Sequence, residues 1–425
     1  MVPKWPILAS IALKKNLKNT NKAISLHIFI RISITSILLA WLITGCQPKT
    51  SDWAAQYPHT QNGSFAASVS SSGNYAVVSS LYHGVSLWDL NSNGAIYNWY
   101  QTPKDQPFSL FNDGDTNAQA DNNFVFATAI APDDSHAVLA DKTNFSLWDI
   151  KTGQNQGYWQ VRQSKVVYRT KTINGATKQL SIYDVVDENK CLNPSSEKNE
   201  HCVVVGNIRA IDVSNEGKNI LIGKSNGVVV HINTTTGRRL EFLGHQQVLF
   251  DDEQKPFHIN NAINSVALSP NGLYALSGSS DQSAYLWSTK TGQVIYKFQH
   301  HNRVVQVALD AQARFAFTAD TGSQASIWDL TTGNLVSQLQ YVNRQEVFSF
   351  ARFSHNGKML VTGAPTRKLS LWDVQTGKQI KEWLVSPRKN SRPASAVVYS
   401  AAFINNDTQI TSESSSGLNE VWDIK

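Results

Sequence analysis

The sequence predicts an all-β protein built from seven repeats, and three observations support this. Short runs of β-branched and aromatic residues alternate with Gly, Ser, Asn and Thr along most of the 425 residues, the pattern typical of strands joined by tight turns. Six alternating apolar runs end in tryptophan. A polar turn precedes each tryptophan at a nearly constant distance. A fixed spacing of this kind is typical of a repeat protein.

Each repeat contains a two-residue position, here called the Trp slot, which is Trp-Asp in most copies. The slots are Trp88 and Asp89, Trp148 and Asp149, Ile232 and Asn233, Trp287 and Ser288, Trp328 and Asp329, Trp372 and Asp373, and Trp422 and Asp423. The last residue of the preceding turn lies 15 positions before the slot in six copies and 14 in the other. Each repeat therefore predicts a rigid unit of strand, turn, strand, turn and strand.

These landmarks resemble WD40 repeats over about residues 53 to 425. The resemblance implies a seven-bladed WD40-type β-propeller with four-stranded antiparallel blades. It also implies that each slot Trp fills the wedge between blades and that the Asp accepts turn N–H groups. The polar pair Gly244-His245 and the acid Asp281 match the family's buried network, whereas Gly322 replaces that acid one repeat later.

The last repeat lacks an outer strand because the chain stops two residues after Asp423. Sheet edges are normally paired or covered. We therefore expect the segment from Trp53 to Tyr57 to complete the last blade and lock the ring.

The N-terminal segment predicts export. Residues 1–31 are basic, residues 32–43 form an apolar run of 12, and Ile43-Thr44-Gly45-Cys46 follows. The run has the length of a signal-peptide core rather than of a membrane span. The last four residues resemble the lipobox of bacterial lipoproteins, which implies a cleaved signal peptide at 1–45, a lipid on Cys46, a tether at 46–52 and a propeller at 53–425. The alternative is an uncleaved signal anchor.

By the same resemblance, Gln47 favours the outer membrane, so the expected location is the cell envelope, with the protein facing the periplasm. The net charge of +6 does not contradict this location. Six basic residues and no acidic ones lie in the first 45 positions, so the remaining chain is neutral. A nucleic-acid-binding surface needs clustered positive charge, and we expect no nucleic-acid partner.

Two cysteines remain after Cys46. In an exported protein, Cys191 and Cys202 predict a disulfide, and two free thiols are the alternative. A metal site is disfavoured because His201 alone accompanies them.

The length variation falls between each Trp slot and the next turn, where the distance ranges from 26 to 69 residues. The three longest connections are consecutive, which predicts a wall on one face of the ring. The largest, 163–205, contains Val166–Lys171 and Lys178–Asp184 around Asn174-Gly175, a strong hairpin signal. Apolar side chains on these connections predict a partner-binding surface, or alternatively pack the loops onto the propeller. The candidates are Phe108, Phe111, Tyr168, Tyr183, Phe250 and Phe257.

We find no catalytic motif, and we expect no cofactor and no metal. Asp113–Asn117 begins like a calcium loop but lacks its later glycine and glutamate. The expected function is therefore a membrane-anchored, monomeric, non-catalytic scaffold that binds partner proteins. The alternative is an exported enzyme or small-ligand binder with its site in the central channel. The inner strands Asn264–Leu268 and Val305–Leu309 carry small, neutral residues, which disfavours catalysis there.

Overall fold

The computed structural model describes residues 51–80, 84–99, 124–161, 164–173, 176–182, 201–250, 256–259, 261–341, 347–391 and 394–425. These residues form strands almost throughout, with one short 3-10 helix, η1 (Asn215–Gly217). Seven four-stranded antiparallel sheets and one five-stranded sheet account for all the strands described.

The first three blades are given from inner to outer strand. They are blade 1, β2 (Ser64–Val69), β3 (Tyr75–Ser80), β4 (Gly84–Asp89) and β5 (Gly94–Trp99); blade 2, β6 (Ala127–Ile130), β7 (His136–Ala140), β8 (Asn144–Asp149) and β9 (Asn155–Gln160); and blade 3, β13 (Ile208–Val213), β14 (Asn219–Lys224), β15 (Val229–Asn233) and β16 (Arg239–Phe242).

The next four blades follow the same order. They are blade 4, β19 (Ile263–Leu268), β20 (Tyr274–Ser279), β21 (Ser283–Ser288) and β22 (Val294–Gln299); blade 5, β23 (Val304–Leu309), β24 (Phe315–Asp320), β25 (Ala325–Asp329) and β26 (Leu335–Gln338); blade 6, β27 (Phe350–Phe353), β28 (Met359–Gly363), β29 (Lys368–Asp373) and β30 (Gln379–Leu384); and blade 7, β31 (Val398–Ile404), β32 (Gln409–Ser414), β33 (Leu418–Asp423) and β1 (Ala55–Pro58).

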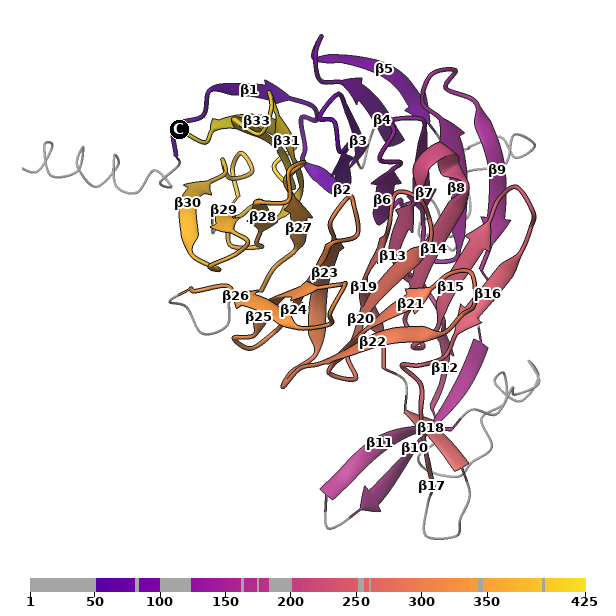
Figure 1. Cartoon of the computed structure of the whole chain (residues 1–425). Coiled ribbons are helices and arrows are strands. Elements are labelled where there is room, and N and C mark those ends of the chain that lie inside the picture. The colour runs from indigo at the N-terminus through magenta and orange to yellow at the C-terminus, as the bar shows by residue number, and fades with distance from the viewer. Residues whose placement is uncertain are drawn as a thin grey trace, which may run out of the picture. The chain divides into compact units, whose positions relative to one another are not determined.

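The inner strands pack side by side in a closed ring, with β2 of blade 1 next to β31 of blade 7 (Figure 1). Seven hydrophobic clusters fill the seven interfaces between neighbouring blades. The fold is therefore a seven-bladed β-propeller, as the sequence predicts. Its core is divided into wedges between blades rather than gathered in one centre.

Blade 7 combines the two ends of the described chain, as expected. The strand β1 pairs antiparallel with β33, with Ala55 opposite Val421 and Pro58 opposite Leu418. The amide of Gln56 donates a 2.7 Å hydrogen bond from Nε2 to Oε1 of the buried Glu420. The first and last strands thus lock the ring.

The slot residues pack as the resemblance implies. Each slot Trp, and Ile232 in blade 3, joins the cluster shared with the preceding blade. The acids after them stabilise the turn between the third and fourth strands: the Oδ1 atoms of Asp149 and Asp373 accept the N–H groups of Thr152 and Thr376. Asn233 accepts the equivalent N–H of Thr236 at 2.8 Å. The slot is therefore structural.

The indole N–H of the slot finds a partner in blades 4 to 7, where it donates at 2.8 Å to a hydroxyl group on the second strand. The pairs are Trp287 with Ser277, Trp328 with Thr318, Trp372 with Thr362, and Trp422 with Ser412. In blade 3 the equivalent position, ten residues before the slot, holds Ile222 in place of the hydroxyl residue. Blade 3 has therefore lost both members of this hydrogen bond together.

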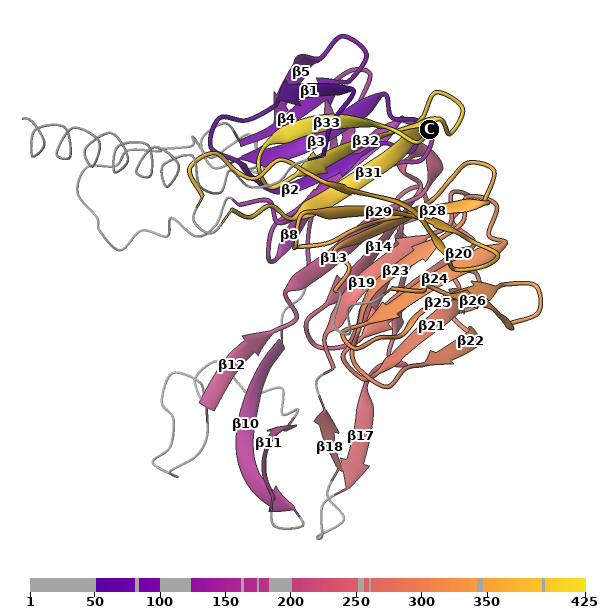
Figure 2. The ribbon, with the colours of Figure 1, turned by 90° about the vertical axis from the view of Figure 1, so that its left-hand side faces the viewer.

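The five-stranded sheet is built from two separate insertions, which Figure 2 shows gathered together. Its order is β12 (His201–Val205), β10 (Ser164–Ile173), β11 (Ala176–Ile182), β18 (Pro256–Ile259) and β17 (Gln247–Phe250). The strands β10 and β11 pair up to Ile173 opposite Ala176, so Asn174-Gly175 connects them, as predicted. We call this five-stranded unit the insertion sheet.

One buried side chain makes the stability of blade 3 depend on pH. His231 is buried in β15, and neither ring nitrogen has a hydrogen-bond partner among the described residues. Burial, followed by the nearby charge of Arg238, lowers the pKa of His231 from 6.5 to about 4. The equivalent positions of blades 1 and 4 hold Leu87 and Leu286.

We expect His231→Leu to stabilise the protein and to flatten its pH dependence. The unfolded chain binds the proton more readily than the folded one, so wild type loses stability as pH falls from about 6.5 toward about 4. Removing an unpaired buried polar group is worth about 1–3 kcal/mol. Urea unfolding at pH 5 and pH 7.5 tests this. Equal losses of stability at low pH in wild type and variant would contradict it.

Candidate functional site

The inner strands of all seven blades enclose a central channel of about 780 Å³. Most of its wall is small or apolar, with residues such as Ala67, Ala129 and Ala308. Ligand pockets commonly have volumes of about 300–1,000 Å³. The channel is therefore large enough for a small molecule or the end of a peptide.

One position of each inner strand forms a ring around this channel. This position lies five residues before the last residue of the turn between the first and second strands of the blade. In each blade it pairs with the residue nine positions later on the second strand, so the positions are equivalent. The equivalent positions are Ser68, Ala129, Asp212, Ala267, Ala308, Arg352 and Ala402. The first six line the channel, and Ala402 is buried between blades 7 and 1. Two of the seven are charged, with opposite signs, and they come from blades 3 and 6. The expectation of a neutral channel holds for the other five positions and is wrong for these two.

Arg352 is partly buried, and its guanidinium group is held in place on one side. Its Nη1 donates to the carbonyl oxygens of Ala401 at 2.8 Å and Ser70 at 3.2 Å. Burial lowers the pKa of Arg352 to about 10, and the charge of Asp212 opposes that shift. The group remains a cation at neutral pH, with its plane fixed by two neighbouring blades.

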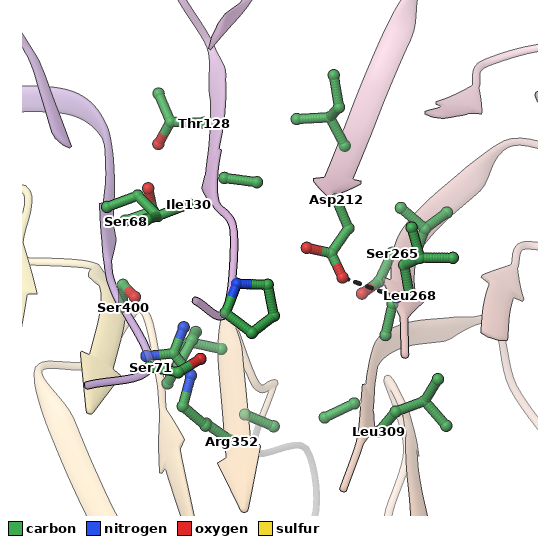
Figure 3. Close-up of a pocket in the computed structure, with 18 of the residues that line it drawn as sticks. Ser68, Ser71, Thr128, Ile130, Asp212, Ser265, Leu268, Leu309, Arg352 and Ser400 are labelled. Carbon is green, nitrogen blue, oxygen red and sulfur yellow. Dashed lines mark hydrogen bonds between the residues drawn. The ribbon is translucent and has the colours of Figure 1, made fainter. Parts of the chain in front are cut away.

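Asp212 lies on a different wall of the pocket from Arg352 (Figure 3). Its Oδ2 accepts the Leu268 N–H at 2.7 Å, and its Oδ1 accepts the Val213 N–H at 2.9 Å. Burial raises the pKa of Asp212 to about 6, against these hydrogen bonds and the charge of Arg352. At pH 7 the carboxyl group is still mainly ionised.

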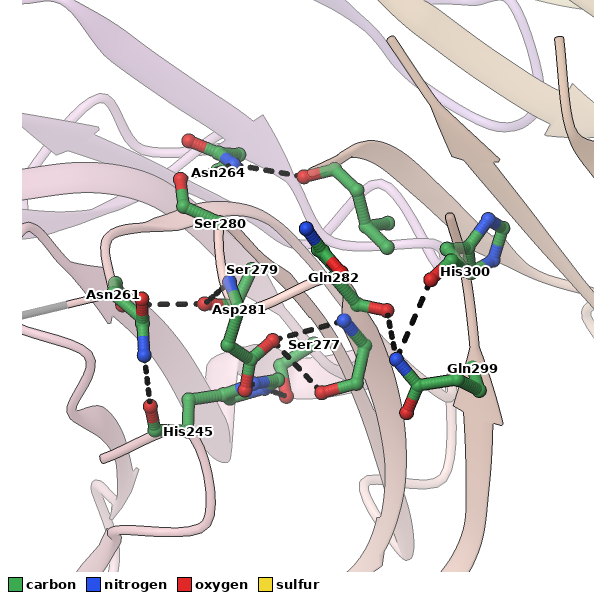
Figure 4. Close-up of polar contacts among 12 residues, drawn as sticks. His245, Asn261, Asn264, Ser277, Ser279, Ser280, Asp281, Gln282, Gln299 and His300 are labelled. Atoms are coloured by element: carbon green, nitrogen blue, oxygen red, sulfur yellow. Dashed lines mark hydrogen bonds and ion pairs between the residues drawn. The ribbon is translucent and has the colours of Figure 1, made fainter. Parts of the chain in front are cut away.

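Other titratable groups of the described residues serve the fold (Figure 4). In blade 4, His245 Nδ1 lies 2.9 Å from Asp281 Oδ2, and its Nε2 lies 2.8 Å from Ser277 Oγ, which also accepts the indole of Trp287. Both His245 and Asp281 side chains are almost fully buried. This chain of contacts ties the connection before the blade to its second and third strands.

Blade 5 repeats the arrangement with one change. His300 Nε2 lies 2.9 Å from Thr318 Oγ1, and its Nδ1 lies 3.6 Å from the buried Asp320. Gly322 does stand at the position of Asp281 in this blade, but the implied loss of the carboxylate is wrong, because Asp320 at the end of β24 supplies it. The distance from the Trp slot does not reveal this acid, because Asp320 lies at the end of a strand, whereas Asp281 lies in the loop that follows the equivalent strand.

The insertions emerge at one end of the blades. Strands β10 to β12 belong to the connection from β9 to β13, and β17 and β18 to the connection from β16 to β19. Every blade runs strand by strand from inner to outer, so these connections all lie on the same face. In the part of the chain that the structure describes, β12 and β17 form the two edges of the insertion sheet.

The model of the WD domain, G-beta repeat family, WD40, matches residues 254–288. That segment contains β19, β20 and β21 with the slot of blade 4, and six further sheets of the same build complete the ring. The protein is a WD40-repeat β-propeller. A search of curated proteins found no match to the WD40 propeller.

Several predicted functional residues of the WD40 propeller fall outside the described residues. These are Cys46, Phe108, Phe111, Tyr183 and Cys191. The disulfide between Cys191 and Cys202 therefore remains a prediction. The other candidates, Tyr168, Phe250 and Phe257, lie in β10, β17 and β18 of the insertion sheet.

Two searches of the described residues gave no site. No three His, Cys, Asp or Glu side chains converge there in a way that could hold a metal ion. No helix among those residues is long and apolar enough to cross a membrane.

Proposed function

We propose that this WD40 propeller is a non-catalytic scaffold, anchored to a membrane of the bacterial envelope, that binds a partner protein through its insertion sheet. WD40 propellers typically act as interaction scaffolds. The observation that carries the finer proposal is the insertion sheet, because two connections flanking blade 3 join to build one surface. Blades 5 to 7 form without such an addition.

The edges of this sheet suit an extended partner segment. The edge strand β12 reads His-Cys-Val-Val-Val and β17 reads Gln-Val-Leu-Phe, without proline, lysine or an acidic residue. Edge strands without such protection readily accept another strand. Strand addition to a sheet edge is a common mode of protein recognition.

The topology supports an anchor on the opposite face. β1 is antiparallel to β33, so its first residue, Ala55, lies near the turns that follow the Trp slots. The connections that carry the insertions lie at the other end of the blades. Eight residues lie between Cys46 and Ala55, so the two are at most about 30 Å apart. A lipid on Cys46 would therefore keep the propeller within this distance of the membrane surface.

Affinity purification from membranes tests the partner site. We expect the full chain to recover a partner that a variant lacking residues 163–205 fails to recover. The double variant Lys151→Ala with Lys378→Ala changes two exposed positions on the opposite face and should retain the partner. Thermal unfolding of each variant checks the propeller. Recovery of the same partners by the deletion variant would overturn the proposal.

Labelling with radioactive palmitate tests the anchor. We expect Cys46→Ser to lose the label and to move from the membrane fraction to the soluble or precursor fraction, because acyl chains supply about 0.8 kcal/mol per buried CH₂. Cys202→Ser is the matched control and should keep the label. An unchanged label and membrane fraction for Cys46→Ser would show that another segment anchors the protein.

A further inference from the structure

We propose that the central channel binds a small zwitterion, with the ligand's carboxylate on Arg352 and its ammonium group on Asp212. This site is distinct from the insertion sheet, and the two proposals can fail independently. Among the described residues, Arg352 has two free donors, Asp212 lies on another wall of the channel, and small residues line the space between them.

Arg352 presents the donor pair that suits a carboxylate. Nη1 makes both of its hydrogen bonds, so Nε and Nη2 have no partner among the described residues. These two N–H groups point the same way and bind a carboxylate side-on. Elsewhere in the described structure, Arg314 binds Asp310 in this way, through Nε at 2.7 Å and Nη2 at 3.0 Å. At Arg352 this pair of donors is open.

Asp212 places the opposite charge across the channel. Blades 3 and 6 are three steps apart in a ring of seven, so their equivalent ring positions face each other almost diametrically. Figure 3 shows the two side chains on different walls of the pocket. Each oxygen of Asp212 accepts one backbone N–H, and a carboxylate oxygen can accept more than one donor. An ammonium group can therefore bind from the channel side.

Asp212 and Arg352 each join inner strands of different blades through hydrogen bonds to backbone groups. Neighbouring inner strands are tied together elsewhere by neutral groups: Ser265 Oγ accepts the Val307 N–H, and Ser400 Oγ accepts the Val69 N–H. Removing a carboxylate and a guanidinium group partly from water costs solvation free energy, and a serine at either position would cost less. The four other ring positions that line the channel are Ser68, Ala129, Ala267 and Ala308, and their small side chains leave room for a ligand between the charges.

The test uses the full chain in detergent and a series of ω-aminocarboxylates from glycine to 8-aminooctanoate, with diglycine and triglycine, measured by isothermal titration calorimetry. We expect binding within a limited range of chain lengths, because the two charges are fixed in the ring. Hexanoate and hexylamine, which carry one charge each, should bind at least about tenfold more weakly than the best zwitterion.

Three variants distinguish this site from a structural role. Asp212→Asn and Arg352→Gln should each weaken binding about tenfold or more, and Arg352→Lys, which keeps the charge but loses the side-on donor pair, should also weaken it. Lys378→Ala, at an exposed position outside the channel, should bind as wild type does. Melting temperatures identify any variant that fails to fold. The proposal is overturned if no zwitterion binds wild type at about 10 mM, or if folded variants bind as tightly as wild type.

Discussion

Deletion of Ser51–Pro58 should destabilise the propeller by about 3–5 kcal/mol, because it removes the only strand that pairs with the free edge of β33 in the described structure. The buried carboxylate of Glu420 would lose the amide of Gln56. A hydrogen bond to a charged group contributes about 1.5–3 kcal/mol, and each further one about 1 kcal/mol. Urea unfolding followed by tryptophan fluorescence measures the loss.

The matched control for this deletion is Trp53→Ala. Trp53 lies just before β1 and is 44% exposed, so its loss should change stability by less than about 0.5 kcal/mol. If the deletion variant unfolds at the same urea concentration as wild type, β1 does not close the ring.

Trp372→Ala should cost about 3–5 kcal/mol, the usual range for a fully buried aromatic side chain. Trp372 is 1% exposed and fills the interface of blades 5 and 6. Its indole also donates to Thr362 Oγ1 at 2.8 Å. The truncation therefore leaves a cavity and an unpaired hydroxyl group. Thermal and urea unfolding measure the effect.

Trp372→Phe separates packing from hydrogen bonding at the same site. Phenylalanine fills most of the space but cannot donate, so we expect a smaller loss of about 1–2 kcal/mol. If both variants are as stable as wild type, the Trp slot is not what holds neighbouring blades together.

The sequence was sufficient to predict the ring. The Trp slots and the turns before them are local patterns that can be recognised in each repeat separately. The spacing between turn and slot is the same in blade 3, although Ile232 replaces the tryptophan there. The closing strand could also be predicted, because the last repeat has only three strands of its own. The segment from Trp53 to Tyr57 lies ahead of the first repeat and can supply the fourth strand.

The insertion sheet could not be predicted, because its pairing joins segments that blade 3 separates in the chain. Among the described residues, Ser181 and His258 are the one pair that joins the two insertions, and no local pattern marks such a contact. The charged pair in the channel was predictable in principle. Asp212 and Arg352 both lie five residues before the last turn residue, where five other repeats have Ala or Ser, and aligning all seven repeats would have revealed them.

We propose that the partner binds the insertion sheet and not the opposite face of the propeller. Photo-crosslinking amino acids placed at Val204 in β12 and Val248 in β17 test it most directly, with Thr236 and Lys378 in the turns of the opposite face as matched positions. We expect crosslinks to the partner from Val204 or Val248 and none from Thr236 or Lys378. Crosslinks from the opposite face alone would contradict the proposed function.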